Sequence, residues 1–179
     1  NQLRAAYPEV PGMADYCVYW FRRAHDALDE TTAENPFQGR AGLVGTQNVR
    51  NNKSREGGLD HITSTGTIVE AVDNQPWSGE ANVHVSIVNW VKTKDAVLLP
   101  KSRRLWSMSD NKKTKGDRQP DLLIQNCANI NSALTPGAGV GAKRKLECNA
   151  VPKRCFQGKI PGYDGFLVDE ATRMSFPEE

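Results

Sequence analysis

The segment from Gly66 to Lys92 constrains the fold of this chain more than any other, because it contains two strand-like runs joined by a short turn. The first run, Thr67–Val72, is apolar and β-branched, and the second, Ala81–Trp90, has the two-residue alternation of a strand. Only about eight residues join the runs, whereas a crossover between parallel strands needs about a dozen or more. We therefore predict that these two strands run antiparallel.

Helical and strand-like patterns alternate upstream of this unit. Met13 to about Glu30 is apolar at every third or fourth position. Arg40–Thr46 has the length of a buried strand, and Lys53–Ser64 has a helical pattern that Gly57 and Gly58 weaken. The apolar stripe expected on the first helix comprises Met13, Cys17, Trp20 or Phe21, Ala24, and Ala27 or Leu28. This order predicts an α/β fold, a three-layer sandwich around a largely parallel sheet with a terminal antiparallel strand, followed by an irregular basic segment.

The cysteines and the apolar runs limit the class of protein. None of the four cysteines forms a CxxC pair, so nothing in their spacing supports a metal site or a disulfide framework. No apolar run approaches the ~20 residues of a membrane helix, and the first residues are not a signal peptide. We expect a cytoplasmic protein with no membrane partner, and we interpret Asn1 as the start of a piece of a longer protein.

Positive charge is concentrated in the second half of the chain. Residues 1–95 contain 9 Lys/Arg and 12 Asp/Glu, whereas residues 101–159 contain 13 basic and 4 acidic residues. This asymmetry favours a scaffold joined to a surface for a polyanion, although a solvated tail would have the same composition. The predicted phosphate-contact surface comprises Lys101, Arg103, Arg104, Lys112, Lys113, Lys115 and Arg118 together with Trp106, and it is extended by Lys143, Arg144, Lys153 and Arg154.

Four segments, in their order and spacing, resemble the second half of a gamma-type DNA adenine methyltransferase of the MmeI-like family of single-chain restriction–modification enzymes. They are Met13–Phe21, Ala41–Asn48, Gly66–Asp73 and Ala81–Trp90. Two later segments, Pro152–Gly158 and Gly162–Leu167, resemble the opening of that family's target-recognition region. The resemblance implies that residues 1–99 form the second half of a Rossmann-like methyltransferase domain. It implies that residues 100–179 form a linker and the start of a DNA-reading region.

The resemblance also implies a function. Such enzymes flip an adenine out of double-stranded DNA and transfer a methyl group from S-adenosylmethionine to its exocyclic amine. In the family, the Gly-rich cofactor loop and the catalytic Asn-Pro-Pro-Tyr/Phe motif precede the helix that Met13–Glu30 resembles, and neither is in this sequence. We therefore expect no catalytic residue, no bound S-adenosylmethionine and no activity in this chain alone, which would need the missing N-terminal half of the methyltransferase domain. The alternative is a non-catalytic, DNA-binding α/β module.

Three residues have candidate roles at the target base. Trp77 lies in the turn before the last strand, where related enzymes place an aromatic side chain on the flipped base; packing on a neighbouring loop is the alternative. Gln47 and Asn48 follow a strand and are expected to line the substrate side, with simple turn chemistry as the alternative. His84 alternates on a strand and is interpreted as structural. In this placement, Gly66–Lys92 forms the closing edge of the sheet.

Overall fold

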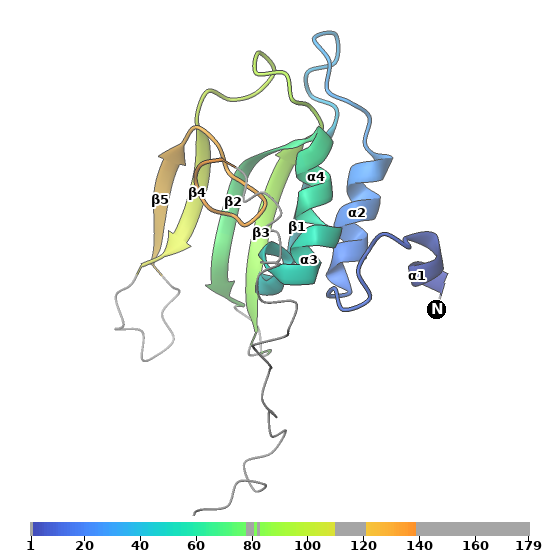
Figure 1. The fold of residues 1–179 in the computed structure, drawn as a ribbon. Coiled ribbons are helices and arrows are strands. Elements are labelled where there is room, and N and C mark those ends of the chain that lie inside the picture. The colour runs from blue at the N-terminus through green and yellow to red at the C-terminus, as the bar shows by residue number, and fades with distance from the viewer. Residues whose placement is uncertain (1, 78–80, 82, 110–120, 139–179) are drawn as a thin grey trace, which may run out of the picture. The chain divides into compact units, whose positions relative to one another are not determined.

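The computed structural model describes residues 2–77, 81, 83–109 and 121–138, which all belong to one unit (Figure 1). The helices are α1 (Gln2–Ala6), α2 (Cys17–Ala27), the short 3₁₀ helix η1 (Gln47–Arg50), α3 (Asn52–Gly57) and α4 (Leu59–Thr65). The strands are β1 (Arg40–Thr46), β2 (Thr67–Pro76), β3 (His84–Val91), β4 (Arg103–Met108) and β5 (Leu122–Cys127). None of the helices in this part of the chain has the length and apolar character needed to cross a membrane.

The five strands form one mixed sheet in the order β1-β3-β2-β4-β5. β3 pairs antiparallel with both β2 and β1, which confirms the antiparallel prediction for the strand–turn–strand unit. β4 pairs parallel with β2, and β5 antiparallel with β4. β1, β2 and β4 therefore run in one direction, and β3 and β5 in the other.

Two expectations about this sheet are wrong. The sheet is not largely parallel in its pairings, because the short turn after β2 returns β3 into the position between β1 and β2. For the same reason the strand–turn–strand unit, β2 and β3, does not form an edge of the sheet. It occupies the centre, and β1 is the outermost strand on that side.

One face of the sheet packs against α2 and α4, and α3 lies beside these two helices (Figure 1). The rings of Phe21 and Trp90 stack at the centre of this interface, with centroids 5.8 Å apart. The main core cluster comprises Phe21, Val49, Leu59, Ile62, Ile68, Ala71, Val88, Trp90, Leu105, Ile130 and Leu134. Because side chains alternate along a strand, this core identifies which strand residues face the helices and which face away.

The buried face of α2 differs from the predicted stripe. The helix begins at Cys17 rather than Met13, and Val18, Tyr19, Phe21 and His25 are its buried residues. Met13 is 87% exposed and Trp20 48% exposed. Ala27 is also exposed, so these three residues of the predicted stripe are wrong. The buried face is shifted because α2 also packs against the chain that precedes it, where Val10, Val18 and Tyr19 form a second apolar cluster.

The weakness predicted at Gly57 and Gly58 is a break between α3 and α4. The chain approaches closely there: a Cβ on Gly57 would lie 3.0 Å from Cδ of Pro11 and 3.1 Å from Cγ1 of Val10. A glycine at this position therefore permits α3 to pack against the lead-in to α2.

The region after residue 99 is not irregular throughout. β4 and β5 extend the sheet beyond the strand–turn–strand unit. The charges that begin β4, Arg103 and Arg104, obscured its strand pattern in the sequence. The sheet thus includes strands from both sides of the predicted boundary between residues 99 and 100. Whether the two sides have different functions stays a prediction.

Candidate functional site

The carboxyl ends of β1 and β2 meet at one edge of the sheet. Thr46 near the end of β1 and Gln75 near the end of β2 both lie opposite Val85 of β3. The residues that follow these strands, Gln47–Asn48 and Trp77, therefore lie at the same edge. Open α/β sheets bind ligands beyond the carboxyl ends of their strands. The structure thus places Gln47, Asn48 and Trp77 at one edge of the sheet.

Asn48 is held by the chain that leads into α2. Its amide Nδ2 donates to Asp15 Oδ1 across 3.1 Å and to Ser54 Oγ across 3.3 Å. Thr46 Oγ1 donates to the second carboxylate oxygen of Asp15. Both N–H groups of the Asn48 amide are therefore engaged in fixing η1, which favours the turn interpretation for this side chain. Gln47, the neighbour of Asn48, is exposed.

Trp77 follows directly on β2. Its backbone N–H donates to the carbonyl oxygen of Val83 across 2.8 Å, which fixes the position of Trp77 against the start of β3. Its side chain is 46% exposed, so one part of the ring is open to a ligand. His84 Nδ1 lies 2.9 Å from Asn74 Oδ1 across the same ladder. That hydrogen bond confirms the interpretation of His84 as a structural histidine.

A second polar group at this edge was not predicted from the sequence. Asp73 of β2 lies 3.9 Å from the guanidinium of Arg50, and Ser107 Oγ donates to its carboxylate across 3.1 Å. Asp73 Oδ1 and Arg50 Nε are buried and have no hydrogen-bond partner in the part of the chain that the structure describes. Buried polar atoms are almost always paired in native proteins. These two atoms therefore point to a further polar contact at this edge.

Sequence signals for Arg50 and Asp73 existed but were weak. Arg50 is the only charged residue in the turn Gln47–Asn52, and Asp73 ends the apolar run of β2. Neither position shows that the two side chains meet, because their contact depends on the sheet packing that sets η1 beside β2.

Two residues of the predicted phosphate-contact surface, Arg104 and Trp106 of β4, share one partner on β2. Arg104 Nη2 donates to Glu70 Oε2 across 3.0 Å, and Trp106 Nε1 donates to Glu70 Oε1 across 2.9 Å. Lys101 and Arg103 lie at the amino end of β4, and because β4 is parallel to β2 this end is opposite the edge of Trp77. A strand the length of β4 spans about 20 Å, so these two residues and Trp77 do not face the same phosphate.

The other predicted phosphate contacts lie outside the described residues. They are Lys112, Lys113, Lys115 and Arg118, together with the extensions Lys143, Arg144, Lys153 and Arg154.

The comparisons with known proteins give a structural relation but no sequence relation. No protein-family profile matches the sequence, and no curated protein matches it. Among solved structures, the type IIL restriction-modification enzyme MmeI in complex with DNA is similar over 78% of this chain, with a TM-score of 0.52 and 18% sequence identity. The match covers 18% of the MmeI chain, so this chain spans less than a fifth of that protein.

At this identity the likeness shows the fold alone. This chain has a mixed α/β fold compatible with a Rossmann-like sandwich, and its relation to a restriction-modification enzyme is loose. The function must be argued from the site.

Proposed function

We propose that this chain is part of a site-specific DNA adenine-amino methyltransferase, dependent on S-adenosylmethionine, within a restriction–modification protein. The observation that carries the proposal is the fold that this chain shares with a restriction-modification enzyme in complex with DNA. At the carboxyl edge of this chain's sheet, Gln47 and Trp77 are exposed together, whereas Asn48 fixes the turn beside them. Trp77 stacks on the flipped adenine, a contact worth roughly 1–3 kcal/mol per base. The 46% exposure of its side chain leaves the ring available for that contact.

The unpaired buried atoms of Arg50 and Asp73 support the proposal that a group outside the described residues binds at this edge. Arg50 Nε and Asp73 Oδ1 are buried without partners in the described part of the chain, and an unmet buried polar group costs about 1–3 kcal/mol. In the proposal their partners come from the assembled DNA-binding cleft. Arg50 contributes a positive charge at this edge of the sheet, and Asp73 orients that guanidinium.

The outer edge of β1 supports the proposal that another half of the domain pairs with this strand. β1 ends the sheet on its side, and no described strand pairs with its outer edge. An edge strand presents unpaired backbone N–H and C=O groups that accept another strand. We propose that the N-terminal half of the methyltransferase domain, absent from this chain, adds its sheet at β1.

The face of the sheet opposite the helices supports a contact with the same domain half. One apolar row crosses all five strands there, in the pairing order Val44, Ile87, Val72, Trp106 and Ile124. Val44 is 47% and Ile124 is 48% exposed, and the described helices lie on the opposite face. Sheets of α/β proteins usually bury both faces. The proposed domain half therefore covers this row as the third layer.

In the proposal, S-adenosylmethionine binds to the other half of the domain. One hollow, of about 180 Å³, lies at the amino end of β2 beside Thr67 and Lys94. Another, open and of about 350 Å³, lies over Gly42 and Asn89 on the second face. Neither lies at the carboxyl edge with Trp77, so the proposal assigns the cofactor and the catalytic Asn to the other domain half. The isolated chain accordingly has no transferase activity.

The reading frame that encodes this chain tests the proposal. A strand, a Gly-rich loop and Asn-Pro-Pro-Tyr/Phe encoded directly upstream of Asn1 would support it. A start codon near Asn1, with none of these elements before it, would contradict it and favour the non-catalytic DNA-binding module.

A further inference from the structure

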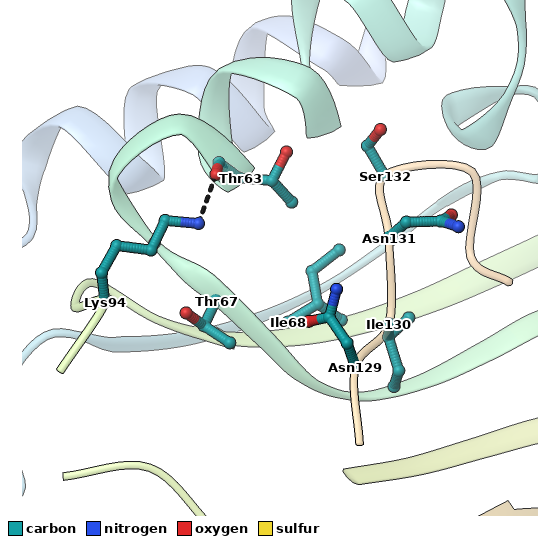
Figure 2. A pocket seen from close by; sticks show the side chains of 9 residues that line it. Thr63, Thr67, Ile68, Lys94, Asn129, Ile130, Asn131 and Ser132 are labelled. Carbon is teal, nitrogen blue, oxygen red and sulfur yellow. Dashed lines mark hydrogen bonds between the residues drawn. The ribbon is translucent and has the colours of Figure 1, made fainter. Parts of the chain in front are cut away.

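A pocket opens at the amino end of β2, at the opposite edge of the sheet from Trp77. Its volume is about 180 Å³, far above the roughly 15 Å³ that a single water needs. Figure 2 shows Thr63 and Lys94 on one side and the segment 129–132, which follows β5, on the other. The pocket therefore joins parts of the chain that are distant in sequence, and the fold of the sheet fixes its width.

The lining of the pocket is polar and has one charge. Its nine residues include no Asp or Glu, and Lys94 is the only ionisable residue among them. The full lining is Thr63, Gly66, Thr67, Ile68, Lys94, Asn129, Ile130, Asn131 and Ser132. A cation without a carboxylate beside it in a polar pocket favours an anionic ligand.

Several polar groups of the lining are already engaged. The hydroxyl of Thr63 donates to the carbonyl of Leu59 across 2.8 Å, and that of Thr67 to the carbonyl of Thr93 across 2.8 Å. The side chain of Asn131 is bonded within its own loop through both its nitrogen and its oxygen. These groups shape the walls rather than bind a ligand.

Three donors remain available for a ligand. Lys94 Nζ donates one of its three hydrogens, to the carbonyl oxygen of Thr63 across 2.5 Å, and keeps two. Asn129 Nδ2 donates one hydrogen to the carbonyl of Gly137 across 3.0 Å and keeps the other. The hydroxyl of Ser132, in a residue only 5% exposed, has no hydrogen bond to the described residues.

We propose that this pocket binds a phosphate-type oxyanion, with Lys94 as the counter-charge and Ser132 and Asn129 as hydrogen-bond donors. A compact ammonium combined with neutral donors suits an anion whose oxygens point in several directions. The site is separate from the base-stacking edge, and it stands whether or not the proposed methyltransferase function holds.

The surrounding charges support an anion. Partial burial, followed by repulsion from Arg103, lowers the pKa of the Lys94 ammonium. Arg103 Nε is buried and has no hydrogen-bond partner in the described part of the chain. Two cations thus lie near one another without a carboxylate in the pocket lining, and a bound anion would relieve their repulsion.

The phosphate group has two possible sources, a free phosphate ion or the backbone of DNA. Backbone amide shifts of Thr67 and Ser132 should be followed by NMR in two titrations, one with inorganic phosphate and one with a short DNA duplex. Ionic strength is held constant with chloride in both, because salt alone weakens contacts between charges. Saturable shifts with phosphate indicate a free-ion site, and saturable shifts with the duplex alone indicate a backbone-phosphate site; either supports the proposal.

Matched variants separate the pocket from general charge effects. Lys94→Met should weaken the binding by about tenfold, and Ser132→Ala by a smaller factor. Lys53→Met is the control, because Lys53 is an exposed lysine that lies outside the pocket lining and pairs with Glu56. An absence of saturable shifts with both probes, or an equal loss in Lys94→Met and Lys53→Met, would overturn the proposal. Ser132→Ala, which leaves the charge unchanged, provides the test if Lys94→Met does not fold.

Discussion

Arg104 of β4 lies opposite Glu70 of β2, and its guanidinium Nη2 donates to Glu70 Oε2 across 3.0 Å. The same carboxylate accepts a hydrogen bond from the indole of Trp106. Two residues that the charge pattern assigned to DNA thus meet on one acidic side chain within the sheet. Arg104 is nevertheless 57% exposed, and an exposed ion pair is worth only about 0.2–1 kcal/mol, so the pair reduces its attraction for DNA without abolishing it.

This pairing predicts unequal contributions to DNA binding. In a protein that carries this chain and binds duplex DNA, Lys101→Ala should reduce the slope of log affinity against log salt by about 0.9, the value for one lost phosphate contact. Arg104→Ala should reduce it by less, because Glu70 already neutralises part of that charge. Affinities measured at several salt concentrations check both changes. Equal slopes for Lys101→Ala and the unmodified protein would show that Lys101 does not contact phosphate.

Local patterns predicted the first three strands better than the sheet that they form. Arg40–Thr46 and the strand–turn–strand unit follow from composition and alternation, and the short turn required an antiparallel pair. The sequence could not show on which side of β2 the returning strand would lie, because both neighbouring positions satisfy the turn. β4 was missed because the charges of Arg103 and Arg104 break its alternation. The segment Asp121–Ile130, which contains β5, has a pattern that fits either a short strand or a helix.

Asp15 is predicted to hold the beginning of the candidate edge. It accepts hydrogen bonds from Thr46 and Asn48, and it thereby ties η1 to α2. Asp15→Ala should lower the free energy of unfolding by about 1–3 kcal/mol, because the amide of Asn48 loses an acceptor. Urea unfolding of the isolated chain measures this change.

Asp29→Ala is the matched control for Asp15→Ala. Asp29 is exposed, so its replacement should change stability by about 0.5 kcal/mol or less. Equal changes in the free energy of unfolding for the two replacements would show that the Asp15 hydrogen bonds do not stabilise the fold. The sequence showed Asp15 only as a negative charge near the start of a helix. Its contacts with Thr46 and Asn48 come from packing between segments about thirty residues apart in the chain.

His25 is predicted to make the fold sensitive to acid. It is 1% exposed, and burial, followed by the charges of His61 and Lys92, lowers its pKa from 6.5 to about 4. The unfolded chain, with a pKa near 6.5, binds the proton more readily. Above pH 6.5, neutral His25 therefore makes its full contribution to stability. As the pH falls towards 4, the free energy of unfolding decreases by about 2 kcal/mol.

Unfolding by urea at pH 7 and at pH 4.5 tests this effect. His25→Gln should show a smaller loss between the two pH values than the unmodified chain. His84→Gln should retain the full loss, because His84 is only partly buried and is paired with Asn74. The same loss in all three proteins would contradict the assignment to His25.

The outer edge of β1 predicts self-association of the isolated chain. Among the described strands none pairs with the outer edge of β1, and the side chain of Val44 on this strand is exposed. A charged residue on an edge strand opposes edge-to-edge pairing, so Val44→Lys should raise the fraction of monomer in sedimentation experiments. Val97→Lys, in a loop where Val97 is 89% exposed, should not. If the chain is monomeric at every concentration, this result would argue against the outer edge of β1 as a binding surface for another strand.

Methyl transfer tests the central proposal most directly. Tritium from labelled S-adenosylmethionine should enter DNA when this chain is joined to the upstream half of the domain, and not when the chain is alone. In the joined protein, Trp77→Ala should lower turnover roughly tenfold, as loss of a base-stacking contact predicts, with unfolding unchanged. Trp20→Ala, which removes an equally exposed tryptophan from α2 (48% against 46%), should leave turnover unchanged. Transfer by the chain alone, or equal turnover of Trp77→Ala and the unmodified protein, would contradict the account.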